Sequence, residues 1–508
     1  MPCPWSLQAR ACEAVRDADK LRVWPKWAAT DRELSVHDFR SFVRLLEENG
    51  GLDRIPREVD PRFEQAAVMQ KLDQAHRAFL FERVKGSRYA AVGGLLNTLP
   101  RFGLALKQHN PEQFGDAEFD ALLEAAKASP IDPVETRQAV SQEVVIEGDD
   151  VDLATLPIPT FFELDTGPFM TAAIGITRHP ENGVYNIGVY RTLIIGKNRC
   201  VINASSMSDL RQHYLAWEAT EEPMPIALAI GADPAMLVAA ACKLPPNVPE
   251  FGVGGALKGS PVELVKCKTN DLLVPASAEF IIEGTVDFSE KVENLLGEFA
   301  GQYGPETAPA TTVTAITHRR DPLFHTIMAG RNPEHNTLGS VAVYGVQRSI
   351  EASLRPILPQ LKDIHVFLEP GLGTLAHVVV SIDKQSDEEP QHIIEAAFKA
   401  GGHIFPVSKI TKRIIVVDDD IDVHSMDDVQ WAIWNRAAAA EKFRVIPDVE
   451  SWELERAAKA GQLSARIGID ATMDLDDVDK LVRPITPGAA ELRLEDYLGA
   501  KSGKKTAA

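Results

Sequence analysis

The segment from Thr171 to Ala329 constrains the fold most strongly, because it is rich in short β-type runs separated by turn residues. A four-residue turn at 196–199, Gly-Lys-Asn-Arg, joins two of these runs. Two helical patterns interrupt the strands. One begins after Ser208, and the other begins at Asp233-Pro234, where aspartate is a good N-cap and proline a good first residue. This pattern predicts a β-barrel or sandwich with a few inserted helices.

The segments on either side of this block predict mixed α/β structure. Before it, Ser35 with Asp38 predicts a capping box, and a second helix is expected over 116–129. The apolar face of the first helix would consist of Phe39, Phe42, Val43 and Leu46. After the block, strand and helix patterns alternate, as in a compact α/β domain.

The length of 508 residues allows two to four domains at about 150 residues each. We therefore predict an α/β (α+β) multidomain protein with four parts. These are an N-terminal α/β domain (1–140), a central domain (141–330), a C-terminal α/β domain (331–480) and a C-terminal tail (481–508).

Charge and cysteine usage exclude several classes of protein. The 73 acidic residues outnumber the 53 basic ones, and a net charge of −20 disfavours a general nucleic-acid or anionic-membrane binder. The five cysteines form no CxxC motif, which argues against a disulfide framework or a structural zinc site. The N-terminal residues lack the apolar core of a secretory signal, and no apolar stretch is long enough to span a bilayer. We expect a cytoplasmic protein without nucleic-acid or membrane partners.

Two familiar motifs are only weakly supported. Residues 251–257 resemble a dinucleotide-binding loop, but the third glycine position is Leu257 and no strand directly precedes the motif. The acidic run at 418–422 follows an apolar strand and could bind magnesium. Its alternative role is structural, with acids that cap the next helix and face solvent, and the residues alone favour that role.

A more specific group of polar residues lies in the central segment. It comprises Asn186 and Arg191 in one strand-like run, His213 on a short helix, Glu250, and the pair Glu293 and Glu298. Asn186 and Arg191 fall on opposite strand faces unless Gly188 allows a bend. The two glutamates are five apart and share a face on neither a helix nor a strand, so their convergence requires an irregular turn. Taken singly, His213 could be a core histidine and the glutamates a solvated edge.

Taken together, these segments resemble the UbiD family of prenylated-FMN-dependent decarboxylases. The resemblance covers about 165–472 and depends on motifs in the family's order: NIGVYR, RQH, GADP, PEFGVGGALKGSPVELVKCKTNDLLVPASAEFIIEG, the E-x4-E segment ending GEFAGQYG, VVDDDIDV and IGIDAT. It implies a central split β-barrel that binds the flavin, and a C-terminal domain whose terminal helices form a homodimer or homohexamer. It also implies that the acidic run at 418–422 is structural.

The resemblance implies the chemistry of the carboxylate group. A carboxy-lyase removes CO2 from an sp2 carbon, and a cofactor must hold the electrons that remain. Arg191 would orient the substrate carboxylate through paired hydrogen bonds. Glu298 would be the general acid that protonates the carbon, with a pKa raised by burial, and Glu293 would link the two in an Arg–Glu–Glu network.

The resemblance also implies how the cofactor is held. Prenylated FMN would contact Asn186, Ile187, Gly188, Val189, Tyr190, Arg191, Gln212, His213 and Glu250. Its phosphate would be bound through Mn2+ or Mg2+ held by Asn186, His213 and Glu250, a ligand set that suits these ions better than zinc. A K+ or Na+ ion is expected near Ala239, Cys242 and Glu250. Of two candidate lysines for the phosphate, Lys409 and Lys412, we choose Lys409.

This chain departs from the family pattern between the two glutamates. Many members carry Gly-Pro-aromatic there, where this chain has Asn294-Leu295-Leu296, so the loop shape can differ. Gln302 also replaces an aromatic or small residue. Both changes lie near the expected substrate side.

The substrate prediction is an aromatic, heteroaromatic or α,β-unsaturated carboxylic acid, with an aryl-CoA thioester as the alternative. Arg331, His335 and Asn336 could read polar groups of the substrate or simply form a solvated loop. A split-barrel flavin oxidoreductase and a non-catalytic carboxylase subunit also remain open. Expected partners are CO2 and a flavin prenyltransferase that supplies the cofactor.

Overall fold

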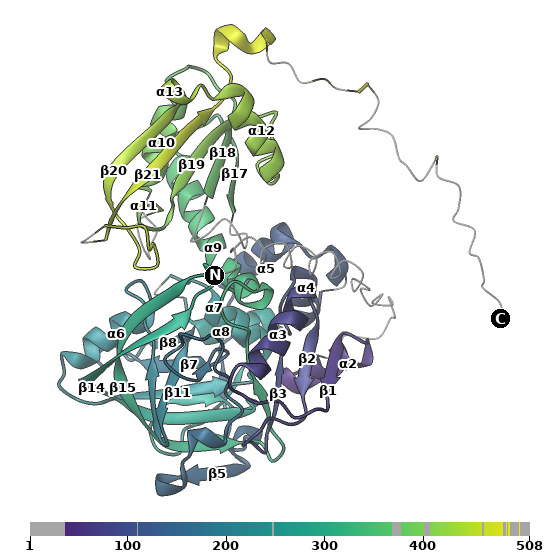
Figure 1. Cartoon of the computed structure of the whole chain (residues 1–508), viewed down its shortest axis with the longest axis vertical. Coiled ribbons are helices and arrows are strands. Elements are labelled where there is room, and N and C mark those ends of the chain that lie inside the picture. The colour runs from purple at the N-terminus through teal and green to yellow at the C-terminus, as the bar shows by residue number, and fades with distance from the viewer. Residues whose placement is uncertain are drawn as a thin grey trace, which may run out of the picture.

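The computed structural model describes residues 36–108, 110–245, 248–367, 377–400, 407–459 and 462–480, with positions 484, 486, 487 and 497. Figure 1 shows an N-terminal and a central part side by side, and a C-terminal part joined to them through the long helix α9 (Pro333–Leu354). The mixed α/β, multidomain prediction is confirmed. Most of the predicted tail and the terminal helices expected for oligomerisation lie outside the described residues.

The N-terminal part is a small sheet covered by helices. Its helices are α2 (Phe39–Glu48), α3 (Glu64–Gln74), α4 (Leu99–Ala105) and α5 (Asp116–Ala128), and its strands are β1 (Leu52–Ile55), β2 (Ala78–Phe81) and β3 (Ala90–Gly93). The sheet order is β1-β2-β3-β16, so its fourth strand, β16 (Leu323–His325), comes from beyond the central strands. This long-range pairing fastens the end of the central part to the N-terminal sheet.

The first helix confirms its predicted apolar face but corrects its cap. Phe39, Phe42, Val43 and Leu46 are all buried. The N-cap is Asp38, whose carboxylate accepts a hydrogen bond from the Ser41 backbone, while the Ser41 hydroxyl closes the capping box. Asp38 is thus the cap itself and not the capping-box partner that the sequence predicted, and the predicted cap Ser35 lies outside the described residues.

The central part is built on an antiparallel sheet in the order β6-β9-β10-β15-β14-β11-β7-β8, with β5 paired to β15. Its strands are β5 (Val144–Glu147), β6 (Phe169–Met170), β7 (Ile174–Arg178), β8 (Tyr185–Val189), β9 (Thr192–Gly196), β10 (Arg199–Ile202), β11 (Met224–Ile230), β14 (Phe280–Gly297) and β15 (Tyr303–His318). A second, three-stranded sheet consists of β4 (Val134–Glu135), β12 (Glu263–Lys266) and β13 (Leu273–Pro275). The inserted helices are α6 (Asp209–Glu218), α7 (Pro234–Ala241) and α8 (Glu250–Lys258).

Two sequence expectations are settled by these helices. Ser208 and Asp233 are the N-caps of α6 and α7, as predicted. Residues 251–257, which resembled a dinucleotide loop, are the body of α8, so that weak motif is not a loop.

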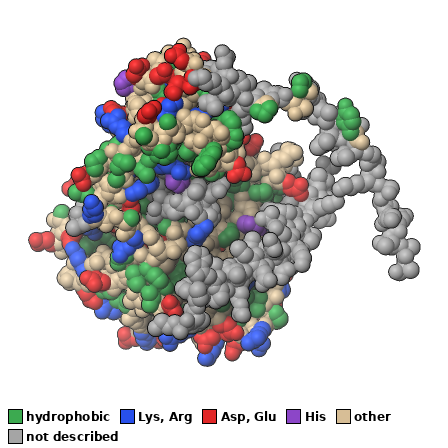
Figure 2. Space-filling view, turned by 45° about the horizontal axis from the view of Figure 1, so that its top comes forward, with side chains coloured by type: hydrophobic (Ala, Val, Ile, Leu, Met, Phe, Trp, Pro, Cys, Tyr) green, Lys and Arg blue, Asp and Glu red, His purple; other side chains and the backbone are tan. Residues whose placement is uncertain are grey.

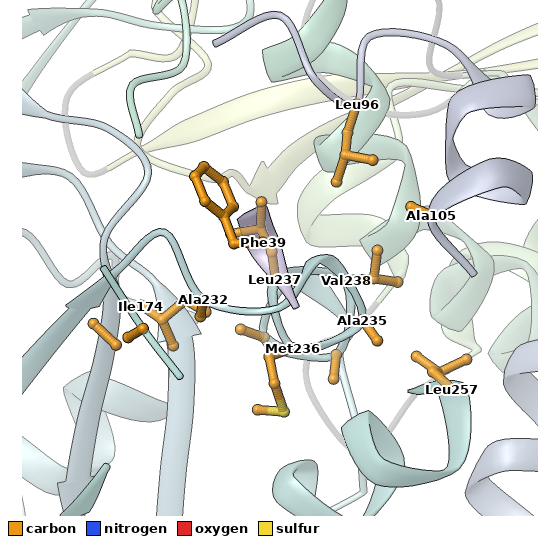
Figure 3. Packing of buried hydrophobic residues seen from close by; sticks show 14 of the residues in the cluster. Phe39, Leu96, Ala105, Ile174, Ala232, Ala235, Met236, Leu237, Val238 and Leu257 are labelled. Atoms are coloured by element: carbon orange, nitrogen blue, oxygen red, sulfur yellow. The ribbon is translucent and has the colours of Figure 1, made fainter. Parts of the chain in front are cut away.

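Helix α7 is buried on all sides and joins the first two parts through one apolar core. Its residues Met236, Leu237 and Val238 belong to the same cluster as Phe39 of α2 and Leu96 of the segment before α4 (Figure 3). A helix that is apolar all round is stable only when it is enclosed. The N-terminal and central parts therefore share a core.

The C-terminal part is a five-stranded sheet in the order β17-β18-β19-β21-β20. Its strands are β17 (Leu361–Phe367), β18 (His377–Ile382), β19 (Arg413–Asp418), β20 (Phe443–Glu450) and β21 (Leu463–Ala471), and its further helices are α10 (Glu389–Lys399), α11 (Val407–Ile410), α12 (Met426–Arg436) and α13 (Ala439–Lys442). The acidic run begins at the end of β19, where Asp418 and Asp420 both form ion pairs with the buried Arg436 at 2.7 Å. This supports the structural role, and the described residues hold no group of three His, Cys, Asp or Glu able to bind a metal.

None of the described helices is long and apolar enough to cross a membrane. On the face drawn in Figure 2, acidic, basic and apolar side chains are interspersed, and the basic ones visible there form no continuous patch.

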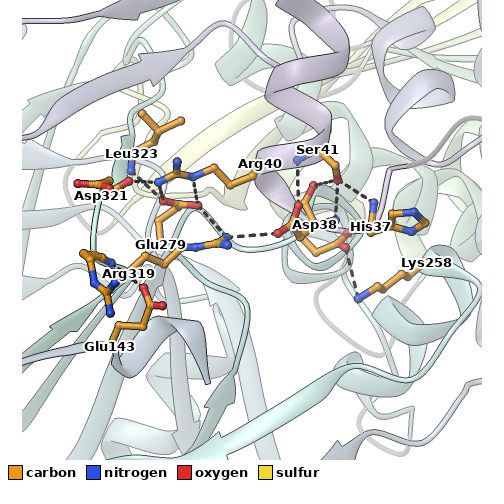
Figure 4. A network of polar contacts seen from close by, with 12 residues as sticks. His37, Asp38, Arg40, Ser41, Glu143, Lys258, Glu279, Arg319, Asp321 and Leu323 are labelled. Atoms are coloured by element: carbon orange, nitrogen blue, oxygen red, sulfur yellow. Dashed lines mark hydrogen bonds and ion pairs between the residues drawn. The ribbon is translucent and has the colours of Figure 1, made fainter. Parts of the chain in front are cut away.

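A buried carboxylate, Glu279, fastens α2 to the central sheet (Figure 4). Glu279 has no exposed surface and accepts hydrogen bonds from Arg40 at 2.8 and 2.7 Å, from Arg319 at 3.3 Å and from the Leu323 backbone at 2.8 Å. Arg319 also pairs with Asp38, the cap of α2. One carboxylate thus connects the N-terminal helix, the end of β15 and the start of β16.

Glu279→Gln is expected to destabilise the protein by about 3 kcal/mol, because it leaves two arginines without their buried counter-charge. The measurement is the denaturant midpoint followed by tryptophan fluorescence. Glu47→Gln, which breaks a largely exposed pair with Arg54, is the control and should cost less than about 1 kcal/mol. Equal losses in the two variants would contradict this role for Glu279.

Candidate active site

Arg191 lies at a break between β8 and β9. The sequence predicted one strand-like run that holds both Asn186 and Arg191, but β8 ends at Val189, and the Tyr190 ring lies against Gly188. The Tyr190 hydroxyl lies 3.1 Å from the Asn186 amide nitrogen, and a Cβ at Gly188 would overlap the tyrosine ring. Gly188 therefore makes room for Tyr190, and the break that results takes Arg191 out of the strand.

Two carboxylates face the Arg191 guanidinium. Glu298 forms an ion pair with Nη1, and the Glu306 Oε1 lies 3.4 Å from Nη2. The three side chains are 20%, 2% and 9% exposed, respectively. Burial lowers the pKa of Arg191 and raises that of Glu306, although the guanidinium opposes the latter shift. A single positive charge thus faces two buried acids, which favours a proton on one of them.

The register of β14 and β15 decides which glutamates reach this group. Asn294 lies opposite Glu306, and Glu293 lies opposite Thr307. Directly opposed residues share a face of the sheet, and neighbours along a strand point to opposite faces. Asn294 and Glu298 are buried on the Arg191 side, whereas Glu293 is exposed.

The predicted convergence of Glu293 on Arg191 is therefore absent from the structure. β14 continues without irregularity from Lys291 to Gly297, so the turn that this convergence required does not form. Leu295 and Leu296, which replace Pro and an aromatic residue in many family members, permit a regular strand. Arg191 and Glu298 lie together as the resemblance implied, but they pair directly and without Glu293 between them. Glu306 was missed, because its closeness to Arg191 comes from the β14–β15 hairpin, which was not predicted from the sequence.

The tip of the β14–β15 hairpin holds Glu298 in a narrow space. The Glu298 backbone N–H donates to the Gln302 carbonyl at 2.7 Å, which closes a tight turn. A Cβ at Gly304 would lie 2.7 Å from Glu298 Cγ and Oε1 and 3.0 Å from Leu454. Because Gly304 has no side chain, the Glu298 carboxylate can occupy this space.

The segment after β20 covers this tip from the C-terminal part. Glu453 accepts hydrogen bonds from the Ser206 backbone N–H and hydroxyl, both at 2.8 Å. The Gln302 amide donates to the Leu454 carbonyl. Gln302, the second departure from the family pattern, therefore contacts another domain. Sequence reasoning missed this cover, because nothing local links 453 to 206.

Aromatic side chains extend the same enclosure. The Phe299 ring lies 6.0 Å, between centroids, from both His335 and Trp452. The Nδ1 of His335 and the Nε1 of Trp452 are buried and have no hydrogen-bond partner among the described residues. Burial, with a further contribution from Arg191, lowers the pKa of His335 to about 4, so the ring is neutral at pH 7.

The start of α9 positions His335. The buried Glu334 accepts hydrogen bonds from the backbone N–H groups of Gly94, Leu95 and Leu96 at 2.7, 2.7 and 2.9 Å. Of the other two residues expected on the substrate side, Asn336 is buried and donates to the Asn332 carbonyl, and Arg331 is exposed. The solvated-loop alternative is therefore wrong for His335 and Asn336.

A second polar group surrounds β8. Asn186 is buried on this strand, and the His213 Nδ1 lies 2.8 Å from the Thr177 hydroxyl. Glu250 is the first residue of α8, and the Ile187 backbone hydrogen-bonds to its carboxylate. Burial lowers the pKa of His213 to about 4 and raises that of Glu250 to about 7. An amide oxygen, a carboxylate and the free Nε2 of a neutral imidazole fit a hard divalent cation.

The remaining predicted cofactor residues have different environments. Ile187 and Gly188 are buried in β8, Val189 is half-buried, and Gln212 is exposed. The Ala239 carbonyl, expected near a monovalent ion, accepts a hydrogen bond from the Cys242 N–H at the end of α7. Lys409 pairs with the exposed Glu450 at 2.7 Å, whereas Lys412 contacts both Glu455 and Ser464. Lys409 would have to give up only one contact to bind a phosphate, whereas Lys412 would have to give up two. The role of Lys409 at the phosphate stays a prediction.

Comparisons with known proteins concern the family and the fold of the chain. Three family models described as parts of UbiD, 3-octaprenyl-4-hydroxybenzoate carboxy-lyase, match the chain: the N-terminal domain at 43–118, the Rift-related domain at 132–332 and the C-terminal domain at 343–471. The structure is similar to that of the UbiD-class enzyme HmfF from Pelotomaculum thermopropionicum in complex with FMN. The two chains are 32% identical with a TM-score of 0.77, and the match covers 91% of this chain and 100% of that one.

Two further structures are also similar. An evolved dimeric form of the same HmfF, in complex with prFMN, matches at 32% identity and a TM-score of 0.75, over 91% and 100% of the two chains. The closed form of vanillic acid decarboxylase from Sedimentibacter hydroxybenzoicus matches at 24% identity and a TM-score of 0.77, over 91% and 98%, which shows a shared fold.

Gly304→Ala should displace the Glu298 carboxylate and destabilise the protein by about 1 to 3 kcal/mol, because the added methyl group overpacks a filled space. A crystal structure would show the displacement, and chemical denaturation would give the loss. Gly196→Ala is the matched control, since its Cβ would make only an ordinary contact of 3.5 Å with Arg199. An unmoved Glu298 in Gly304→Ala would contradict the assignment.

Proposed function

Because the chain belongs to the UbiD family of carboxy-lyases, we propose that it decarboxylates an aromatic, heteroaromatic or α,β-unsaturated carboxylic acid, reversibly and with prenylated FMN. The observation that carries this proposal is the buried Glu298 carboxyl held on Arg191. An acid and a guanidinium enclosed together can bind a carboxylate and return a proton to the carbon that loses it.

Arg191 orients the substrate carboxylate in this proposal. A guanidinium has five N–H donors in a fixed fork, and Glu298 and Glu306 face only its two terminal nitrogens. The remaining donors are available for the substrate. The substrate carboxylate would bind to an Arg191 guanidinium whose positive charge Glu298 and Glu306 already partly neutralise. The carboxylate would therefore be held only moderately, which promotes its loss as neutral CO2.

The proton balance assigns Glu298 its role. The carbon–carbon bond to the carboxylate breaks, CO2 leaves, and the bonding electron pair stays on the substrate carbon. That carbon takes the proton from the Glu298 hydroxyl, and solvent restores the proton to the carboxylate. Each turnover therefore consumes one proton, and the reverse sequence carboxylates the product at high CO2.

The chain's residues fit the cofactor that this chemistry needs. When bound, prenylated FMN supplies the electron sink for a carbon that cannot stabilise an anion alone. Asn186, His213 and Glu250 would hold Mn2+ or Mg2+ against its phosphate. Burial raises the pKa of Glu250 although Lys243 opposes the shift, and no ion pair of Glu250 forms among the described residues, which supports a cation there. K+ or Na+ near Ala239 and Cys242, and Lys409 at the phosphate, complete the proposed site.

The substrate wall favours an acid with a polar group on its ring. The unpartnered Nδ1 of His335 and Nε1 of Trp452 can both engage a ring hydroxyl, a ring heteroatom or a second carboxylate. We therefore place a free aromatic or heteroaromatic acid before an aryl-CoA thioester. A flavin oxidoreductase or a non-catalytic subunit would have no need of Glu298 on Arg191. Homo-oligomerisation, cytoplasmic location and cofactor supply by a flavin prenyltransferase belong to the same proposal.

Glu298→Gln should lower decarboxylation by more than about 10³-fold while the flavin stays bound, because the amide cannot donate an acidic proton. Turnover is measured by CO2 release from a panel of acids, using protein co-expressed with a flavin prenyltransferase. Mass spectrometry of the extracted cofactor confirms prenylated FMN in both proteins. Unchanged turnover in the variant would contradict the role of Glu298 as the general acid.

Removal of the divalent ion should release the flavin, because the phosphate then faces Glu250 without a bridging cation. Dialysis against EDTA followed by flavin absorbance of the retained protein tests this, and Mn2+ added back should restore binding. His213→Ala should behave like the dialysed protein. Full flavin retention in both would overturn the proposed metal site.

A further inference from the structure

We infer that Glu306, and not Glu293, is the second carboxylate that acts on Arg191 during decarboxylation, as a positioning residue that keeps the guanidinium neutralised while Glu298 carries the proton. The inference rests on the proposed function and deepens it. It reassigns one member of the Arg–Glu–Glu network that the family resemblance predicted.

The geometry carries this reassignment. The Glu306 Oε1 lies 3.4 Å from the Arg191 Nη2, its side chain is 9% exposed, and its Oε2 is buried without a hydrogen-bond partner. Burial of a carboxylate without full pairing costs stability, and proteins retain such costs mainly at functional sites. The only guanidinium paired with it in the described structure is that of Arg191.

The position of Glu306 follows from the same register that excludes Glu293. Glu306 lies opposite Asn294, and Asn294 and Asn203 exchange two hydrogen bonds of 2.8 and 2.9 Å, which fix this pair of strands beside Arg191. The Arg191 carbonyl also accepts a hydrogen bond from the Asn203 N–H at 3.0 Å. Glu293 could reach the guanidinium only if β14 shifted by one residue, which would expose Asn294 and Glu298.

Charges from all the surrounding elements favour this division of roles. Arg191 and Glu306 both interact with Glu453 of the C-terminal part, Glu306 interacts with Arg211 of α6, and His335 of α9 is neutral. Arg191 and Arg211 are thus balanced by Glu306 and Glu453. Glu298 can then hold its proton without leaving an uncompensated arginine.

The test compares Glu306→Gln, Glu306→Asp and Glu293→Gln in the prenylated-FMN holoenzyme, with Glu290→Gln as an exposed-glutamate control on the same strand. Without Glu306, Arg191 attracts the ionised form of Glu298. The alkaline limb of the kcat–pH profile should therefore move to lower pH by about one unit, with kcat at pH 8 falling about tenfold. Glu306→Asp should recover part of the loss, and Glu293→Gln and Glu290→Gln should stay within about twofold of wild type.

A second measurement does not depend on turnover. Benzoate binding to the flavin-loaded protein, followed by calorimetry, should become at least about fivefold tighter in Glu306→Gln, because an anion no longer competes for Arg191. Damage to the fold would instead weaken binding. Glu293→Gln and Glu290→Gln should leave the benzoate affinity unchanged.

The outcomes separate this inference from the proposed function. A shifted pH limb and tighter benzoate binding confined to the Glu306 variants support it. A loss confined to Glu293→Gln, or wild-type behaviour of Glu306→Gln in both measurements, overturns it. If wild-type protein decarboxylates none of the acids yet Glu306→Gln still tightens benzoate binding, the proposed function fails while the pairing of Glu306 with Arg191 stands.

Discussion

The pairing of β14 with β15 is the constraint on which the rest of the site depends. Because side chains alternate along a strand, the register that places Asn294 opposite Glu306 also decides that Glu298 faces Arg191 and that Glu293 faces solvent. The same two strands form the middle of the central sheet, so a slip of one residue would disturb the contacts of β10 and β11 as well. The chemistry of the site is thus held by the most extensive pairing in the protein.

Two buried glutamates outside the site extend this constraint to the other parts of the chain. Glu279 ties α2 to the end of β15, and Glu334 ties the first turn of α9 to the backbone of residues 94–96. Each carboxylate has several donors, which is the condition under which a buried charge is tolerated. His335, which follows Glu334 directly, is therefore oriented by the N-terminal part although it contacts Phe299 of the central part.

Local features of this protein were predictable from sequence, and long-range ones were not. The caps Ser208 and Asp233, the apolar face of α2 and the grouping of Glu298 with Arg191 all followed from short motifs or from the family resemblance. The parallel pairing of β16 with β3 and the cover of the site by Glu453 join residues more than 200 positions apart. Glu293 was misplaced because the motif spacing was retained while the residues between the glutamates, which set the strand's regularity, had changed.

The cover formed by residues 452–454 has a kinetic consequence. Glu453, Leu454 and Trp452 belong to a different domain from the acid that they enclose, and a substrate that enters between the two domains would have to separate their contacts with Ser206, Gln302 and Phe299. The rate of such a domain separation does not depend on which carbon–carbon bond the enzyme breaks. The carbon isotope effect on CO2 release would accordingly be small, and the turnover rate of the fastest substrates would fall as solvent viscosity rises.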